Sequence, residues 1–290
     1  MAVTLSTDLY IPEVWADLAQ EQFVGKAIVA GSPAVLVDDE LTGKPGETVN
    51  FPKWMLLDEM EDVDEDEALV PEKLTQSNSQ ATIKEAGKAV EWTDKAKLTG
   101  IGNVQDEAIR QFGILSARKV DRDLITAATA VVTGGITYAD GTTATNSAPK
   151  TLTATGGLNW ANVVKAGLLF GDDFDPSQFA GLYVNSAGAE VMMNDDKFIQ
   201  AAQTAQGNTL VNGGLLGTKN GLRVFLTNRL AANKALLLKQ NSLGLMYKRR
   251  PIVEQDRDIL ARTTVVATNQ HYAVKRLADD GVVDITLASA

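Results

Sequence analysis

The chain has 290 residues, of which 44% are hydrophobic and 22% charged, so it can bury a core and suggests one large or two small domains. Its 37 acidic and 27 basic residues give a formal net charge of -10, which argues against a nucleic-acid-binding protein with an extended basic surface. The absence of cysteine and the single histidine, His271, exclude disulfides, thiolate catalysis and zinc sites built from cysteine or clustered histidine. The N-terminus lacks a signal-peptide pattern and no run approaches the roughly 18 apolar residues of a membrane span, so we expect no membrane partner.

Residues 1–30 are expected to form an extended arm that leads into an amphipathic helix. Pro12 suits the helix start, and Val14, Leu18 and Phe23 give an apolar stripe. Residues 31–46 are rich in turn-forming residues and have the composition of a linker.

Residues 47–93 contain two predicted β-runs, at 47–54 and 81–93, separated by an acidic segment. Eight carboxylates lie within this segment: Asp58, Glu59, Glu61, Asp62, Asp64, Glu65, Asp66 and Glu67. A hairpin with so long and acidic a tip is marginal in water on its own, so the tip is either a solvated loop or covered by a partner surface. A calcium loop is disfavoured, because Glu67 and Lys73 stand where a glycine and a bidentate acid are required.

Residues 103–133 are predicted to form one long helix that ends at Gly134-Gly135. Asn103 can cap its start, and Asp106 and Glu107 in the first turn suit the helix dipole. Apolar residues recur at helical spacing, with a phase slip and an expected bend near residues 113–117. The helix is either a strut against which other elements pack or an ordinary core helix of a large domain.

Residues 134–157 are a small-residue segment that predicts a loop and a domain boundary. An alternating pattern follows, with helices at 158–170 and from Asn185 or Ser186 through Met193, a further helical turn at 197–203 and a glycine-rich loop at 207–221. Short strands are predicted between and after these helices: 182–184, 222–227, 235–238, 245–247, 263–274 and 283–287.

No stretch carries a catalytic, cofactor-binding or metal-binding signature. His271 lies within a predicted strand, and the glycines at 213–221 lack phosphate-loop spacing. The one tight basic cluster, Lys248-Arg249-Arg250, is too small for nucleic-acid affinity and favours a surface ion-pair patch. Catalysis by scattered carboxylates stays open, because pairing in space is invisible in a sequence.

The order of these parts resembles the major capsid proteins of tailed bacteriophages, which share the Hong Kong 97-type fold. The segments that carry the resemblance are LYVNSAGAEVMMNDDKFI (182–199), GGLLGTKNGLRVFLTNRL (213–230), KALLLKQNSLGLMYKRRPIVEQDRD (234–258) and TTVVATNQHYAVKRLADDGVVDITL (263–287). The resemblance covers nearly the whole chain and is most specific over residues 180–287.

The resemblance implies an α+β protein of five parts. These are an N-terminal arm (1–46), an extended loop formed by a β-hairpin with an acidic tip (47–93), a peripheral domain with a spine helix (94–157), an axial domain (158–261) and C-terminal strands of the peripheral domain (262–290). It further implies that copies of the chain assemble into pentamers and hexamers of an icosahedral virion shell in the host cytoplasm. That shell encloses double-stranded DNA, with a separate scaffolding protein, a portal and a possible decoration protein as partners.

We therefore expect a structural protein without enzymatic activity or cofactor. The inter-subunit contact candidates are the eight carboxylates of the acidic segment on one side and Lys248, Arg249 and Arg250 on the other. Two alternatives stay open: the shell protein of a cellular nanocompartment with the same fold, and a carboxylate-dependent hydrolase with an α/β core.

Overall fold

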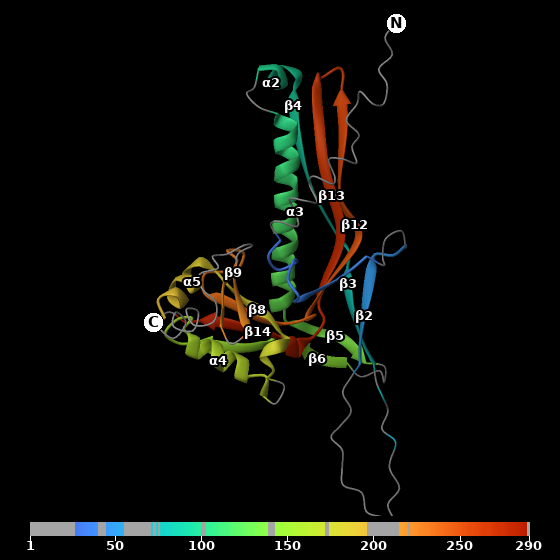
Figure 1. Cartoon of the computed structure of the whole chain (residues 1–290). Coiled ribbons are helices and arrows are strands. Elements are labelled where there is room, and N and C mark those ends of the chain that lie inside the picture. Colours follow the sequence, from blue (N-terminus) through green and yellow to red (C-terminus); the bar gives the residue numbers. More distant parts are fainter. Residues whose placement is uncertain are drawn as a thin grey trace, which may run out of the picture.

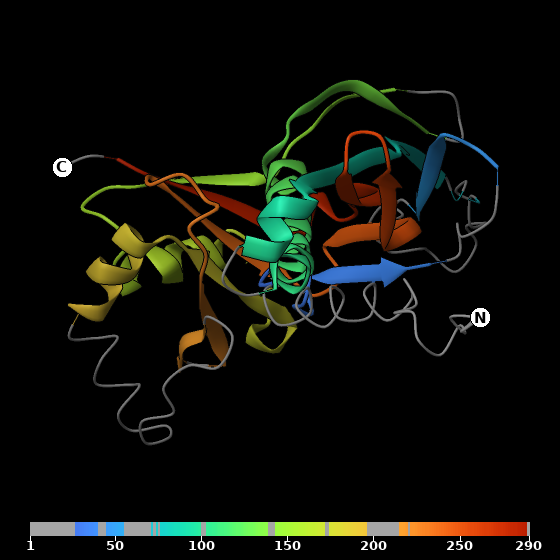
Figure 2. The same ribbon diagram turned by 90° about the horizontal axis from the view of Figure 1, so that it is seen from above.

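The computed structural model describes residues 27–39, 45–54, 71, 74, 76–99, 103–138, 143–171, 174–195, 215–219 and 221–288. The predicted arm helix, the acidic segment 58–67 and the predicted helical turn at 197–203 lie outside these residues. Figure 1 shows one long helix, α3, flanked by long strands, with a second group of strands and helices at the side of its lower end. Figure 2, a view down α3, shows the two groups on opposite sides of the helix.

Helix α3 spans Val104–Thr129, which corresponds to a length of about 39 Å. Asn103 caps it as predicted, since its side chain accepts a hydrogen bond from the Gln105 N–H (3.1 Å). The helix continues through residues 113–117 but ends before the predicted Thr133. The β-branched residues that follow it favour an extended chain, and they begin strand β5 (Val132–Tyr138).

The long strands beside α3 form a four-stranded sheet, which we call the spine sheet, in the order β1-β12-β13-β4. Its strands have the following bounds: β1 Val35–Asp38, β12 Leu243–Asp258, β13 Thr263–Arg276 and β4 Lys84–Thr93. Alternate residues of β13, from Thr264 to Tyr272, are buried on the side that α3 covers. Strand β1 corrects the predicted linker, because a short apolar run pairs in parallel with β12 in spite of its turn-rich flanks.

A second sheet, which we call the hairpin sheet, has the order β2-β3-β5-β6. Its remaining strands are β2 (Thr48–Trp54), β3 (Gln76–Thr82) and β6 (Thr143–Ser147). Two predictions are wrong here. The single run at 81–93 divides at Ile83 into β3 and β4, which join different sheets, and the predicted loop at 134–157 contains β5, β6 and β7 (Lys150–Ala154). The small side chains of this segment give no strand signal in the sequence. The segment becomes regular because the backbones of β5 and β6 pair with each other.

The third sheet has six strands in the order β7-β14-β11-β8-β10-β9. Their bounds, with those of the two adjacent helices, are as follows: β8 Phe179–Val184, β9 Leu215–Lys219, β10 Leu222–Leu226, β11 Lys234–Lys239, β14 Val282–Leu287, α4 Trp160–Leu168 and α5 Ser186–Met193. Asn159 and Asn185 cap the two helices through their side-chain oxygens, so Asn185 is the cap of α5. Strand β9 lies within the predicted glycine-rich loop.

The sheets divide the chain differently from the predicted domain boundaries. The expected boundary between residues 261 and 262 falls in the turn of the β12–β13 hairpin, so both of its strands belong to the spine sheet. The final strand, β14, lies between β7 and β11 in the six-stranded sheet rather than beside α3. Strand pairing between residues far apart in the chain decides this membership.

One apolar cluster joins α3, the spine sheet and the six-stranded sheet, and we call it the junction core. Val120, Leu124 and Ala128 of α3 pack there with residues of the spine sheet, such as Tyr272, and of the six-stranded sheet, such as Leu236. The cluster also contains Val29 and Ala34, which precede β1. The spine sheet and the six-stranded sheet therefore pack against the same half of α3.

Two carboxylates of α3 are buried in or beside the junction core. Asp121 accepts three backbone hydrogen bonds, from the N–H groups of Ile28 (2.9 Å), Val29 (3.1 Å) and Ala30 (2.9 Å), and so fixes the chain before β1. Burial raises the pKa of Asp121, although these hydrogen bonds and the charge of Arg229 act in the opposite direction.

Asp123 links α3 to the spine sheet. Its carboxylate accepts hydrogen bonds from the Tyr272 hydroxyl (2.7 Å) and the Lys119 ammonium (2.8 Å), and Lys84 lies 4.0 Å away. Burial acts to raise the pKa of Asp123, but the hydrogen bonds and the two positive charges outweigh it and lower the pKa. At the end of the helix, the Arg276 guanidinium donates to the carbonyls of Ala128 (2.8 Å) and Ala130 (2.7 Å).

Replacing Asp121 with asparagine is expected to destabilise the subunit by about 1–3 kcal/mol. The asparagine side chain presents a donor where the carboxylate presents an acceptor, so at least one of the three backbone N–H groups loses its partner. Urea unfolding of the dispersed full-length chain measures the effect. Asp106→Asn, in the exposed first turn of α3, is the matched control, and equal midpoints for the two variants would contradict the proposed anchoring.

The contribution of Asp123 to stability is expected to vanish in acid. Because its pKa is lower in the folded than in the unfolded chain, this contribution is present above about pH 4 and is lost as the pH falls through the folded pKa. Urea unfolding at pH 7 and below pH 4 should show Asp123→Asn less stable than the wild type at pH 7. The difference should narrow in acid, and a difference independent of pH would refute the assignment.

Candidate assembly surfaces

The root of the β2–β3 hairpin is packed on the spine sheet. Val49, Phe51 and Ala81 form an apolar cluster with Ala273, and this cluster is lined by side chains of β12 and the segment after β13. Gly244 of β12 leaves the space for this contact, since a Cβ atom there would lie 3.0 Å from the Phe51 ring. Beyond the root, β3 pairs with β5 only at Ser77 and Asn78.

The structure places Lys248, Arg249 and Arg250 where the pairing of β12 with β13 is interrupted, between Tyr247 and Ile252. Each of the three basic side chains has a partner within the chain. The Arg250 guanidinium pairs with Asp39 (2.5 Å), the Arg249 guanidinium donates to the Asn269 side chain (2.7 Å), and the Lys248 ammonium donates to the Gly46 carbonyl (2.5 Å).

The contacts of Arg250 and Lys248 hold the chain on both sides of residues 40–44, which connect β1 to the hairpin sheet. The hydrogen bond to Asp39 raises the pKa of Arg250, and its guanidinium also lies over the Tyr247 ring, 5.3 Å from the ring centre. Of the three contacts, that of Arg250 with Asp39 is an ion pair, whereas Arg249 and Lys248 donate hydrogen bonds to uncharged groups. The acidic segment lies outside the described residues, so its contact with this cluster stays a prediction.

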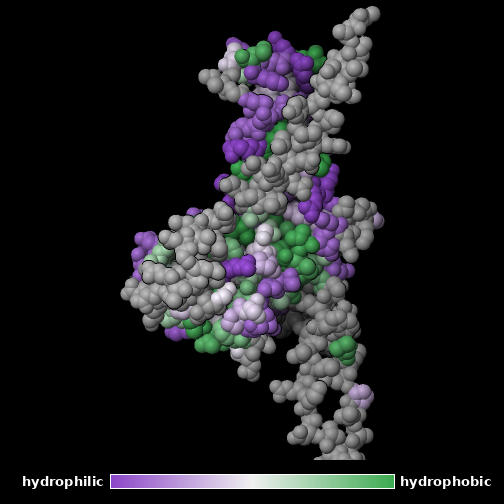
Figure 3. Space-filling view, in the orientation of Figure 1, coloured by the Kyte–Doolittle hydropathy of each residue, from purple (hydrophilic) through white to green (hydrophobic). Residues whose placement is uncertain are grey.

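The far end of the spine presents apolar side chains to solvent, a feature that the sequence analysis missed. Leu98 of α2 (Asp94–Thr99) is 85% exposed, and Ile259 and Leu260 in the β12–β13 turn are 76% and 95% exposed. We call these three residues the spine tip. Figure 3 shows hydrophobic surface beside hydrophilic surface at this end. The signal in the sequence was an Ile-Leu pair between the strands predicted at 245–247 and 263–274.

The backbone of the spine tip is held by several polar contacts. The Asp258 carboxylate accepts hydrogen bonds from the N–H groups of Leu260 (2.8 Å) and Ala261 (2.9 Å), and Arg257 pairs with Asp94 of α2 (2.9 Å). The turn therefore has a defined shape and still exposes two large apolar side chains. An exposed apolar cluster on a well-shaped turn is typical of a surface that another protein covers.

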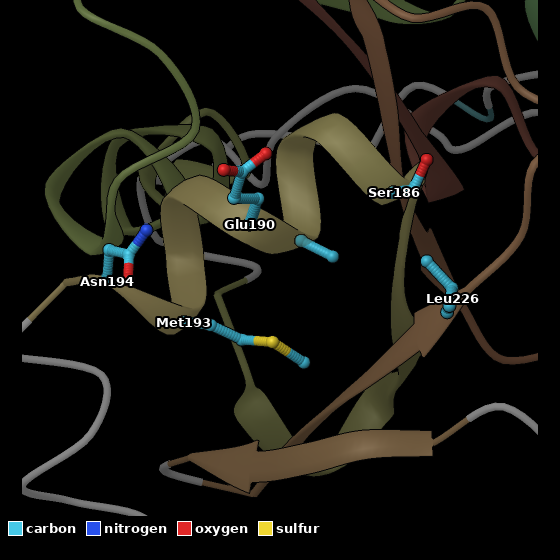
Figure 4. A pocket seen from close by; sticks show the side chains of 6 residues that line it. Ser186, Glu190, Met193, Asn194 and Leu226 are labelled. Atoms are coloured by element: carbon cyan, nitrogen blue, oxygen red, sulfur yellow. The ribbon is translucent and has the colours of Figure 1, made fainter.

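A shallow depression lies between α5 and β10. Figure 4 shows the side chains of Met193 and Leu226 facing this space, while the Glu190 carboxylate points away from Leu226. Its lining therefore offers one carboxylate and no convergent pair. Among the described residues, no group of three His, Asp or Glu side chains is placed to hold a metal ion, and no helix is long and apolar enough to cross a membrane.

Comparison with known proteins was made in three ways. A family model described as "Phage capsid protein" matches residues 77–285. A curated relative, the major capsid protein of Staphylococcus phage phiMR11, is 28% identical over 287 residues, which cover 99% of this chain and 97% of the relative. Similar solved structures include the cyanophage Pam1 capsid asymmetric unit, with a TM-score of 0.68 and 17% identity over 100% of this chain and 97% of that chain. A structure of Mycobacterium phage Che8 has a TM-score of 0.61 and 14% identity over 98% of this chain and 96% of that chain.

The structural likeness confirms the predicted α+β fold of the Hong Kong 97 type over the whole length of the chain. The family model covers well over half of the residues, including α3, both strands of the β12–β13 hairpin and most of the six-stranded sheet. The chain therefore belongs to the phage capsid protein family.

Proposed function

We propose that this chain is the major capsid protein of a tailed, double-stranded DNA phage and that copies of it assemble into pentamers and hexamers of an icosahedral shell. The observation that carries the proposal is the family match over residues 77–285, together with a curated relative of nearly equal length named as a major capsid protein. The spine tip supports it, because its three apolar side chains are exposed in a single subunit. The comparisons favour this function over a nanocompartment shell, since the named relatives are phage proteins.

Within this proposal, α3 and the spine sheet correspond to the peripheral domain and the six-stranded sheet to the axial domain. The β2–β3 hairpin corresponds to the extended loop that reaches a neighbouring subunit. The acidic segment at its tip would then meet a basic surface of that neighbour. Since Lys248, Arg249 and Arg250 already have partners within their own chain, such a contact would have to compete with these interactions.

The proposed location is the virion, with assembly in the host cytoplasm and the genome enclosed without sequence-specific binding. A separate scaffolding protein, a portal and a decoration protein are further proposed partners. The proposed role requires no catalysis. The charges and apolar surfaces of the described residues would serve contacts between molecules rather than a reaction. Many weak contacts suffice for such a shell, because closure makes them act together.

Negative-stain electron microscopy and light scattering of the purified full-length chain test the proposed function. The expected result is closed shells, or rings of five and six subunits, either from the chain alone or after addition of its scaffolding protein. A dispersed monomer in the presence of the scaffolding protein, across a range of salt and protein concentrations, would overturn the proposal.

The double variant Ile259→Ser/Leu260→Ser is expected to lose closed shells while the subunit keeps its stability within about 0.5 kcal/mol, because both side chains are exposed in the subunit. Burial of one such side chain contributes roughly 1.5–3 kcal/mol, and this is lost at every copy of the contact. Shell yield by light scattering and urea unfolding of the subunit provide the two measurements. Leu260→Met is the control that should still assemble; wild-type yield from the double serine variant would exclude the spine tip from assembly.

A further inference from the structure

The half of α3 that follows Leu115 presents only positive charge to solvent. Arg118, Lys119 and Arg122 are exposed there, whereas the two carboxylates of the same half, Asp121 and Asp123, are buried. Lys119 pairs with Asp123, but no hydrogen bond or ion pair engages the side chain of Arg118 or Arg122 among the described residues. Since the two arginines are four residues apart, they lie on one face of the helix.

A third arginine joins this face from another part of the chain. Arg229 lies in the turn after β10, next to Leu230, which packs in the junction core with Val120 and Leu124 of α3. Burial lowers the pKa of Arg229, and the charges of the nearby Arg118 and Arg122 lower it further. The buried Asp121 offsets part of this charge, but its oxygens already accept three backbone hydrogen bonds. We call these three arginines the arginine face.

The face of the spine sheet that is turned away from α3 carries a group of carboxylates. This face holds alternate residues of β4, β13 and β12 that pair across the strands. Its carboxylates are all exposed: Glu85, Glu91, Glu254, Asp256 and Asp258. We call this the acidic face. Arg249 and His271 lie on it beside Glu85, and the other four carboxylates lie toward the spine tip. The spine is therefore a two-layer slab whose helix side is basic in the half after Leu115 and whose sheet side is acidic toward the spine tip.

We propose that the arginine face lines the inside of the shell and binds the phosphate groups of the enclosed DNA, with the acidic face turned outward. This inference rests on the proposed function. A closed shell places the two sides of such a slab inside and outside, and a polyanionic content favours the basic side within. Guanidinium groups match phosphate oxygens in geometry and are poorly hydrated. Arg118 and Arg122, which have no carboxylate partner among the described residues, therefore form a phosphate site with Arg229 beside them.

A small cluster also suits the role. Each phosphate contact adds affinity that falls with salt concentration, and non-specific contacts of this kind carry no sequence information. Two or three contacts per subunit order the DNA layer nearest the wall and still allow the genome to leave. The competing partner is the acidic segment of a neighbouring subunit, which also offers dense negative charge.

The first test measures binding of the dispersed full-length chain to a fluorescent 30-base-pair duplex by anisotropy, from low to physiological salt. The slope of log K against log salt is expected to fall in magnitude by about 0.9 for each phosphate contact removed, hence by about 2 in Arg118→Gln/Arg122→Gln. Both arginines are exposed, so this variant should fold. Arg110→Gln is the matched control on the same helix, because Arg110 is paired with Glu107 (2.6 Å). No binding by the wild type, or an unchanged slope in the double variant, would overturn the proposal.

The second test asks which side faces inward. The chain has no cysteine, so Thr126→Cys beside the arginine face and Glu254→Cys on the acidic face give single labelling positions. In intact shells, a bulky polyethylene-glycol maleimide should modify position 254 and spare position 126, while both should react in the dispersed subunit. The reverse pattern would overturn the inference and leave the shell function intact, because shells would still have formed.

A charge-exchange experiment distinguishes DNA from the acidic segment as the partner of the arginine face. If Arg118→Glu/Arg122→Glu prevents assembly of empty shells and Asp64→Arg/Glu65→Arg in the same chain restores it, the arginine face binds the acidic segment rather than DNA. Empty shells that form normally with Arg118→Glu/Arg122→Glu support the DNA contact.

Discussion

The fold depends on the burial of one half of α3 in the junction core. Val120, Leu124 and Ala128 contact both the spine sheet and the six-stranded sheet, so neither sheet can move without disturbing the same apolar cluster. Three polar groups buried around it have partners: Asp121 has three backbone N–H groups, Asp123 has Tyr272 and Lys119, and the helix end has Arg276. These bonds select one position of the helix, because a buried polar group without a partner is costly.

The other half of α3 has a different environment, and the exposed surfaces follow from it. Among the described residues, the helix packs there on the spine sheet alone, through Ile109 and Phe112 against Trp92 and Val266. This two-layer slab extends far from the junction core and ends in the apolar spine tip. A monomer gains nothing from such surfaces, whereas a shell subunit uses them for contacts with its neighbours.

Proximity in the sequence and proximity in space give opposite answers about the basic residues. Lys248, Arg249 and Arg250 are consecutive, yet they have three separate partners: Gly46 and Asp39 before the hairpin sheet, and Asn269 in β13. Arg118, Arg122 and Arg229 belong to two distant segments, yet they share one face, because Leu230 packs against α3. A net charge of -10 excludes a broadly basic surface but says nothing of a local face.

The sequence by itself determined the elements whose signals are local. The cap at Asn103, the apolar periodicity of α3 and the short apolar runs of β8, β10 and β11 depend on neighbouring residues, and the family resemblance added the fold. Tertiary structure decided the rest: the end of α3 at Thr129, the division at Ile83, β1 within a turn-rich stretch and β14 inside the six-stranded sheet. These features depend on pairing and packing between residues far apart in the chain. Such contacts decide which strand a segment pairs with, and often whether it forms a strand at all.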